Sequence, residues 1–205
     1  MRFSVIATVS TLATGAFSWS PPWYRGSTCL DYDHAQHVAN NFKGTIDAYT
    51  TTLANKIFTS DFHDYSDSVI ELINGGCPSG PKTLGQPTFS SLADFEAGQG
   101  SQPNITFNIL NLWYNCDTVF MRWEGPQPNP YSTAAQEPVR GIIVLETVTS
   151  KKLKSEPYLI KTVYSEFNSG AWLYDLGVFV PTNCTAASRK RDSKLARRTP
   201  VEINA

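Results

Sequence analysis

Apolar residues recur at steps of three or four positions in the first part of the chain, a spacing typical of one face of a helix. Six of them form a single stripe: Val38, Phe42, Ile46, Tyr49, Leu53 and Ile57. Asp31 or Asp33 is placed to cap the start of this helix, and Gly44 weakens it without ending it. We therefore expect one long helix that ends before the polar run 61–66.

Shorter elements are expected after this polar run. Residues 69–73 form a short apolar turn that Gly75 and Gly76 stop. Ser90 or Ser91 then caps a short helix that runs through Phe95.

From Ile105 onward the pattern changes, because apolar residues now alternate with polar ones as they do in β-strands. The proline-rich stretch 125–138 interrupts this alternation and is expected to be a loop. The strands expected are 105–109, 119–123, 142–148, 158–165 and 172–178, the last two joined as a closing hairpin by a turn at 168–170. Helices followed by antiparallel strands predict an α+β domain with its helices on one face of the sheet.

The two ends of the chain differ from this central domain. Met1 and Arg2 lead into the apolar run 3–16, and no second apolar stretch approaches membrane-spanning length. This predicts a cleaved secretory signal at 1–20, with a short buried helix as the alternative. We therefore expect a secreted, extracellular protein with a domain at 21–188, a basic tail at 189–205 and no membrane partner.

Charge is divided unevenly between the domain and the tail. The tail holds six of the 17 basic residues and two of the 18 acidic ones, which leaves an acidic domain that is poorly suited to binding nucleic acid. Three interpretations of the tail stay open. It is an arm that binds polyanions, a substrate for cleavage at Lys190-Arg191 and Arg197-Arg198, or a solvated end.

Four cysteines agree with an oxidising compartment. Cys29, Cys77, Cys116 and Cys184 allow two disulfides in any of three pairings, and none of their spacings matches a metal site. Asn104 and Asn183 begin glycosylation sequons. We expect a disulfide-bonded glycoprotein without a bound metal.

Several segments resemble the secreted fungal members of the nuclear transport factor 2 (NTF2)-like superfamily. They are residues 160–172 (IKTVYSEFNSGAW), 87–89, 98–100, and Cys116-Asp117 before the Arg122-Trp123 pair. The superfamily includes scytalone dehydratase, steroid delta-isomerase and SnoaL-type polyketide cyclases, alongside members without catalysis. The resemblance implies a cone in which a strongly curved antiparallel sheet wraps around the long helix and leaves an apolar pocket at the open end. It also favours the pairs Cys29–Cys116 and Cys77–Cys184.

Two groups of polar residues are candidates for chemistry in such a pocket. If Ile160 and Tyr164 face the helices, Glu166 shares their face and could serve as a general base. The alternative places Glu166 at the rim of the sheet, where it accepts hydrogen bonds from a neighbouring turn or from Arg122.

The second group is the polar run that follows the long helix. Here His63 and Asp64 could form an acid–base pair, and Tyr65 or Tyr164 could donate a hydrogen bond to a carbonyl. The alternative is that these residues only cap helices and form turns. For the pocket lining we expect Tyr114, Arg122, Trp123 and Asn168.

Three functions remain open, because the fold alone implies no activity. The first is a secreted protein that holds a small apolar molecule without reacting with it. The second is a cofactor-independent lyase, isomerase or cyclase that acts on a polyketide- or terpene-like substrate. The third is an interaction protein that acts through the loop 125–138. The candidate partners are a small apolar ligand and a second copy of the chain, and no cofactor is expected.

Overall fold

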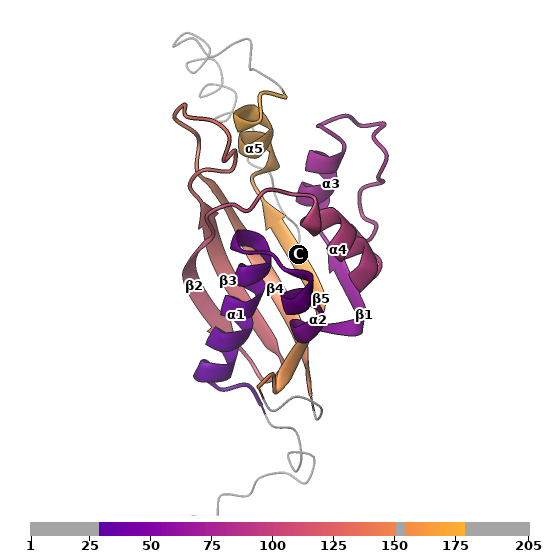
Figure 1. Ribbon diagram of the computed structural model, residues 1–205, viewed down its shortest axis with the longest axis vertical. Helices are drawn as coiled ribbons and strands as arrows, with labels where there is room; N and C mark the ends of the chain where they lie inside the picture. Colours follow the sequence, from indigo (N-terminus) through magenta and orange to yellow (C-terminus); the bar gives the residue numbers. More distant parts are fainter. Residues whose placement is uncertain (1–28, 151–154, 179–205) are drawn as a thin grey trace, which may run out of the picture.

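The helices pack on one face of a five-stranded sheet that curls around them (Figure 1). The computed structural model describes residues 29–150 and 155–178. The elements in chain order are α1 (Tyr32–Asp47), α2 (Thr51–Ile57), β1 (Phe58–Tyr65), α3 (Asp67–Ile73), α4 (Leu92–Gly100), β2 (Asn108–Tyr114), β3 (Thr118–Gly125), β4 (Val139–Thr149), β5 (Tyr158–Phe167) and α5 (Ser169–Asp175). This confirms the predicted α+β class and the cone-like arrangement.

The sheet is mixed rather than wholly antiparallel. Its strand order is β1-β5-β4-β3-β2, and β1 runs parallel to β5 while the other pairs are antiparallel. The sequence pattern did not predict β1, because Asp61, His63 and Asp64 make this run polar. The strand nevertheless buries Phe58 and Phe62. These side chains pack in the hydrophobic core and so hold β1 at the edge of the sheet.

The single long helix that we expected is divided into two. Asp31 caps α1, as one of the two alternatives had it, and Gly44 lies inside this helix. The chain leaves helical geometry at Ala48, and the Thr50 hydroxyl oxygen accepts a hydrogen bond from the Leu53 N–H (3.1 Å), which starts α2. A new N-cap therefore redirects the chain, while the apolar stripe on both helices still faces the core.

The predicted closing hairpin is wrong in its second half. Strand β5 forms as expected, but residues 169–175 form helix α5. The Asn168 side chain accepts a hydrogen bond from the Ala171 N–H (3.0 Å) and caps this helix, and Gly177, with φ of 72°, follows its end. Trp172 and Leu176 alternate in sequence but are also four apart, so the same residues fit one face of a helix.

Elsewhere the predicted local signals agree with the structure. Ser91 caps α4, residues 67–73 extend the expected apolar turn into helix α3, and Gly75 and Gly76 follow α3 with positive φ. Strands β3 and β4 fall on the predicted alternating runs, although their bounds differ by a few residues, whereas β2 begins three residues later than the predicted strand 105–109 and continues to Tyr114.

The predicted disulfide between Cys29 and Cys116 is present and joins the start of α1 to the turn between β2 and β3. Its neighbour Leu30 donates its N–H to the Cys116 carbonyl (2.9 Å). Cys77 is exposed, and its predicted partner Cys184 lies outside the described residues, so that pairing stays a prediction. The signal at 1–20, the tail at 189–205 and Asn183 also lie outside them. Within the part of the chain that the structure describes, no helix is long and apolar enough to cross a membrane.

Candidate functional site

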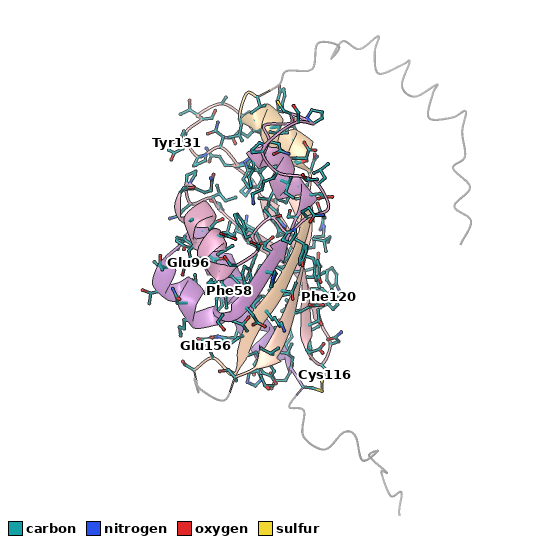
Figure 2. The ribbon with its side chains drawn as sticks, turned by 90° about the vertical axis from the view of Figure 1, so that its right-hand side faces the viewer. Phe58, Glu96, Cys116, Phe120, Tyr131 and Glu156 are labelled. Carbon is teal, nitrogen blue, oxygen red and sulfur yellow. A yellow bond between two sulfur atoms is a disulfide. The ribbon has the colours of Figure 1, made fainter. Side chains whose placement is uncertain are left out.

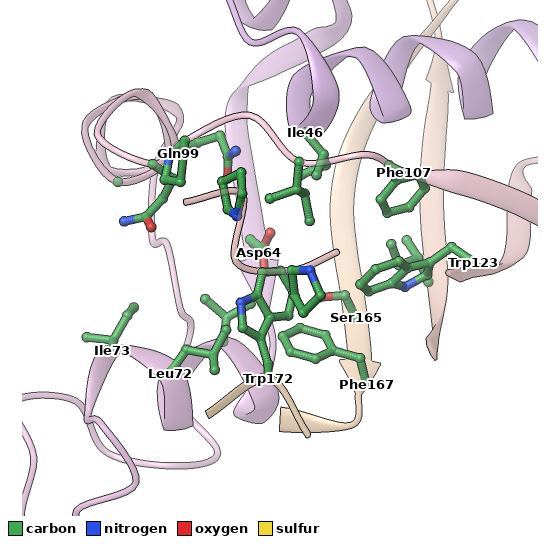
Figure 3. Close-up of a pocket in the computed structure, with 18 of the residues that line it drawn as sticks. Ile46, Asp64, Leu72, Ile73, Gln99, Phe107, Trp123, Ser165, Phe167 and Trp172 are labelled. Carbon is green, nitrogen blue, oxygen red and sulfur yellow. The ribbon is translucent and has the colours of Figure 1, made fainter. Parts of the chain in front are cut away.

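A cavity of about 460 Å³ lies between the inner face of the sheet and the helices, toward the end that carries α3 and α5 (Figure 3). Its volume is in the range of small-molecule sites. The walls are mostly apolar and rich in aromatic rings: Phe42, Phe89, Phe95, Phe107, Trp123, Phe167 and Trp172. The cavity therefore suits a small molecule with a large apolar surface.

Rings from different elements form one side of this cavity. Phe107 stacks on Trp123, with ring centroids 4.6 Å apart and planes 14° from parallel. Phe167 and Trp172 pack beside them with centroids 5.2 Å apart. The Trp123 indole nitrogen is buried and has no hydrogen-bond acceptor among the described residues. This wall offers flat apolar surface and one unused donor.

Asp64 brings a carboxyl group into the same cavity from strand β1 (Figure 3). Its backbone is held on both sides, because its N–H donates to the Phe89 carbonyl (2.9 Å) and its carbonyl accepts from the Thr88 N–H (2.8 Å). The residue is 95% buried, and its Oδ1 atom has no hydrogen-bond partner within the described ranges. The backbone contacts thus fix an unpaired carboxyl group in an apolar wall.

The surroundings of Asp64 change its acidity. Burial raises the pKa of its carboxyl to about 7, and the negative charge of Glu166 adds to this effect. A carboxyl group with such a pKa is present in both protonation states at neutral pH and can give or take a proton. Among the other polar side chains that line the cavity are Ser165, Gln99 and Asn129.

Glu166 does not face the cavity, so the orientation predicted for it is wrong. Thr162 and Val163 are both buried, and this changes which residues of β5 point inward: Ser165 does, while Tyr164 and Glu166 point outward. The pairing of β5 shifts register against both β1 and β4, and simple alternation cannot anticipate such a shift.

Glu166 instead caps helix α3. Its carboxylate accepts hydrogen bonds from the Asp67 N–H (2.9 Å), the Ser68 N–H (3.0 Å) and the Ser68 hydroxyl. This agrees with the alternative position at the sheet rim, although the donors come from α3 and not from Arg122.

The other polar candidates also lie on the outer face of the sheet. The rings of Tyr65 and Tyr164 stack with centroids 5.4 Å apart, and the His63 ring nitrogen Nδ1 lies 2.9 Å from the Asp61 carbonyl oxygen. His63 and Asp64 do not form a pair, because neighbours on a strand face opposite sides. Of the five candidates for catalysis, Asp64 alone lines the cavity.

Of the four residues expected to line the pocket, Trp123 does so. Tyr114 is exposed at the end of β2, Arg122 is exposed on the outer face, and Asn168 caps α5. The aromatic residues that the prediction missed include Phe89 and Phe167. Phe89 lies in a segment that carried the family resemblance, and Phe167 ends β5, so both were close to recognised signals.

Comparisons with known proteins agree with this architecture. A model of the NTF2-like domain family matches residues 28–179, and the chain belongs to this family. AclR from Streptomyces galilaeus, provisionally described as a hydroxylase, is 14% identical, with a TM-score of 0.50 over 82% of this chain and 97% of that protein. A protein from Bacillus cereus ATCC 10987, provisionally described as a polyketide cyclase, is 16% identical, with a TM-score of 0.49 over 74% and 87%.

IdmH from Streptomyces antibioticus, also provisionally described as a polyketide cyclase, is 10% identical, with a TM-score of 0.46 over 70% of this chain and 98% of that protein. At these identities the likeness concerns the fold. A search of curated proteins gave no match.

Proposed function

We propose that this protein binds a small, largely apolar molecule in the cavity and catalyses proton transfer on it without a cofactor, as a lyase, isomerase or cyclase. The observation that carries the proposal is the Asp64 carboxyl group, which is buried in the cavity wall with an unpaired oxygen. A purely structural carboxyl group would be expected to have its oxygens satisfied by hydrogen bonds.

The proposed step is general acid–base catalysis at a carbon next to a carbonyl group. The Asp64 carboxylate takes the proton, the electrons of the C–H bond move into an enolate, and the protonated Asp64 returns the proton to another atom of the same molecule. The pKa of about 7 suits both halves of this step at neutral pH. The aromatic walls favour a polyketide- or terpene-like substrate over a charged metabolite.

Comparing the wild type with Asp64→Asn tests this proposal. The probe is a β,γ-unsaturated cyclic ketone, whose isomerisation to the α,β-unsaturated ketone is followed by ultraviolet absorbance. The variant should lose about 100-fold or more in kcat and should still bind the ketone, as measured by quenching of tryptophan fluorescence. Glu137→Gln, at an exposed position outside the cavity lining, is the control and should retain wild-type kcat.

Equal rates for the wild type and Asp64→Asn would contradict catalysis by Asp64. If native mass spectrometry then found a co-purifying molecule that the protein leaves unchanged, the chain would be a binding protein instead.

We also propose that the chain is secreted and glycosylated. Asn104 supports this because it is exposed. Its side-chain oxygen accepts the hydrogen bond from the Tyr49 N–H, so this bond does not use the amide nitrogen to which a glycan would be attached. Expression in eukaryotic cells tests it. The full chain should reach the medium with glycan on Asn104, and deletion of residues 2–20 should keep it inside the cell.

A further inference from the structure

Two short segments that carried the family resemblance, 87–89 and 98–100, meet beside the cavity in the structure. Phe89 belongs to the segment that leads into α4, and Gly98 lies in the last turn of α4. Glu96, two residues before Gly98, marks this helix on the inner side of the sheet in Figure 2. Phe89 and Gly98 both line the cavity, and neither has a part in the proton transfer proposed for Asp64.

The Phe89 ring occupies the space that a side chain at position 98 would fill. A Cβ atom on Gly98 would lie 2.4 Å from Cε1 and 2.7 Å from Cζ of this ring. Carbon atoms in ordinary contact are about 3.5 to 4.0 Å apart, so a side chain at position 98 would displace the ring. The backbone of Gly98 does not have the positive φ that favours glycine, and glycine weakens a helix relative to alanine. Glycine at this position therefore serves to leave room for the ring.

Two further contacts hold the Phe89 ring in this position. Phe95, three residues before Gly98 and on the same face of α4, packs against it at right angles, with ring centroids 5.6 Å apart. The Lys82 ammonium lies over the ring, 5.7 Å from its centroid, and donates a hydrogen bond to the Thr88 carbonyl (2.6 Å). With α4 and Lys82 on these sides, the open side of the ring is the cavity.

Phe89 is also a direct neighbour of Asp64. The two residues form an antiparallel bridge, in which the Asp64 N–H donates to the Phe89 carbonyl (2.9 Å) and the Phe89 N–H donates to the Asp64 carbonyl (3.3 Å). Residues paired in this way carry their side chains on the same side, with Cβ atoms about 5 Å apart. The Phe89 ring therefore borders the space that a ligand must enter to reach the Asp64 carboxyl group.

We propose that Phe89, held against Gly98, sets the size of the apolar molecule that the cavity accepts beside Asp64. With glycine at position 98 the ring stays against α4, and a ketone of several fused rings fits next to the carboxyl group. A larger residue there would push the ring into this space and admit small ligands alone. Phe89 is thus a specificity-determining residue, and Gly98 is a positioning residue that acts through it. This proposal rests on the proposed function, because it takes the cavity as the ligand site.

Binding of ligands of two sizes tests the proposal on the full-length chain. The probes are a one-ring and a three-ring β,γ-unsaturated ketone, and each Kd is measured by quenching of the fluorescence of Trp123 and Trp172, which line the cavity. Gly98→Ala should raise the Kd of the three-ring ketone by about tenfold or more, because a displaced ring overfills the site. The Kd of the one-ring ketone should change much less.

A second substitution separates this role from a general effect on folding. Phe89→Leu, in the Gly98→Ala background, removes the ring that the new methyl group displaces, so the Kd of the three-ring ketone should return toward the wild-type value. Phe89→Trp, which enlarges the side chain without altering α4, should shift the ratio of the two Kd values in the same direction as Gly98→Ala. It keeps the test decisive if Gly98→Ala does not fold.

Gly170→Ala, in α5, is the matched control. Its Cβ would lie 3.5 Å from the Asn168 Oδ1 atom, an ordinary contact, and Gly170 does not line the cavity. Both Kd values should therefore stay at the wild-type level in this variant, and circular dichroism checks that every variant is folded.

Equal changes in the two Kd values in Gly98→Ala and in Phe89→Trp would overturn the proposal, as would a Kd for the three-ring ketone that Phe89→Leu leaves raised. A wild type that binds neither ketone would overturn it together with the proposed function. Turnover of the one-ring ketone distinguishes the two otherwise. Size selection without isomerisation contradicts the proposed function alone, and isomerisation without size selection contradicts this proposal alone.

Discussion

A carboxyl group such as that of Asp64 normally loses its proton near pH 4, and it does so at a higher pH here because the cavity wall gives the charged form little solvation. Backbone hydrogen bonds to Thr88 and Phe89 hold this part of β1 in place, with Asp64 on the strand face that lines the cavity. At the residue scale, the raised pKa of Asp64 therefore depends mainly on desolvation that the fold imposes on this side chain.

The pKa of Asp64 predicts how the stability of the protein changes with pH. Between about pH 4 and pH 7 the folded protein holds this proton while the unfolded chain has released it, so the free energy of unfolding falls as pH rises through this window. The full effect above pH 7 is at most about 4 kcal/mol.

Asp64→Asn cannot ionise and should escape this loss. We expect it to be more stable than the wild type at pH 8, by about 2 kcal/mol or more, and to show no such advantage at pH 4. Urea unfolding at both pH values measures the difference. A gap between the two proteins that does not change with pH would show that Asp64 does not have the raised pKa.

The sequence named Asp64 as a candidate, but it could not rank Asp64 above Glu166. Alternation along β5 placed Glu166 inside, and that inference failed because two consecutive residues, Thr162 and Val163, are buried. The register of a strand depends on its neighbours in the sheet. Only the paired strands could show which carboxyl group reaches the cavity.

At the scale of elements, short helices at the end of the sheet depend on caps from distant residues. Helix α3 has seven residues, and its first N–H groups are satisfied by Ser66 within the chain and by Glu166 from β5. The negative charge of Glu166 also lies at the positive, N-terminal end of the helix dipole, which is a favourable interaction. A side chain that resembles a general base in sequence thus has a structural task.

Substitutions at Glu166 should show this task. Glu166→Ala should lower the free energy of unfolding by about 1 to 2 kcal/mol, because α3 loses its acceptors, and Glu166→Gln should cost less because it keeps one. Chemical denaturation of both variants provides the measurement, with Glu137→Ala as an exposed control. If Glu166→Ala unfolded at the wild-type denaturant concentration, the cap would contribute nothing measurable.

The elements that were missed share one cause. Strand β1 is polar in sequence and α5 alternates like a strand, so local patterns pointed to the wrong structure. In both cases tertiary contacts determine the secondary structure. Strand β1 pairs in parallel with β5, and helix α5 packs through its buried residue Leu173. Elements whose pattern and burial agree, such as β3 and β4, were predicted correctly apart from their exact bounds.

For the whole molecule, the Cys29–Cys116 disulfide connects the first helix to the far edge of the sheet. The two cysteines are 87 residues apart in sequence, so the bond constrains a long part of the unfolded chain. In the chain-entropy model, closing a loop of this length stabilises the folded protein by about 4 to 5 kcal/mol.

Replacing both cysteines by serine should therefore lower the free energy of unfolding by about 4 kcal/mol. Guanidinium unfolding of the wild type and of the double variant Cys29→Ser/Cys116→Ser measures the loss. A double variant as stable as the wild type would mean that the bond does not form in solution.

The order of apolar and polar residues was enough to predict the α+β class of the fold and most of its helices and strands. These features are governed by local spacing and by the tendency of apolar surface to leave water, which the sequence records directly. Only the tertiary structure decided three features: which side chains of β5 face inward, that residues 169–175 form helix α5, and that Asp64 and not Glu166 lines the cavity. They depend on which strands pair and in which register, and a shift of one residue turns every side chain of a strand to the opposite face.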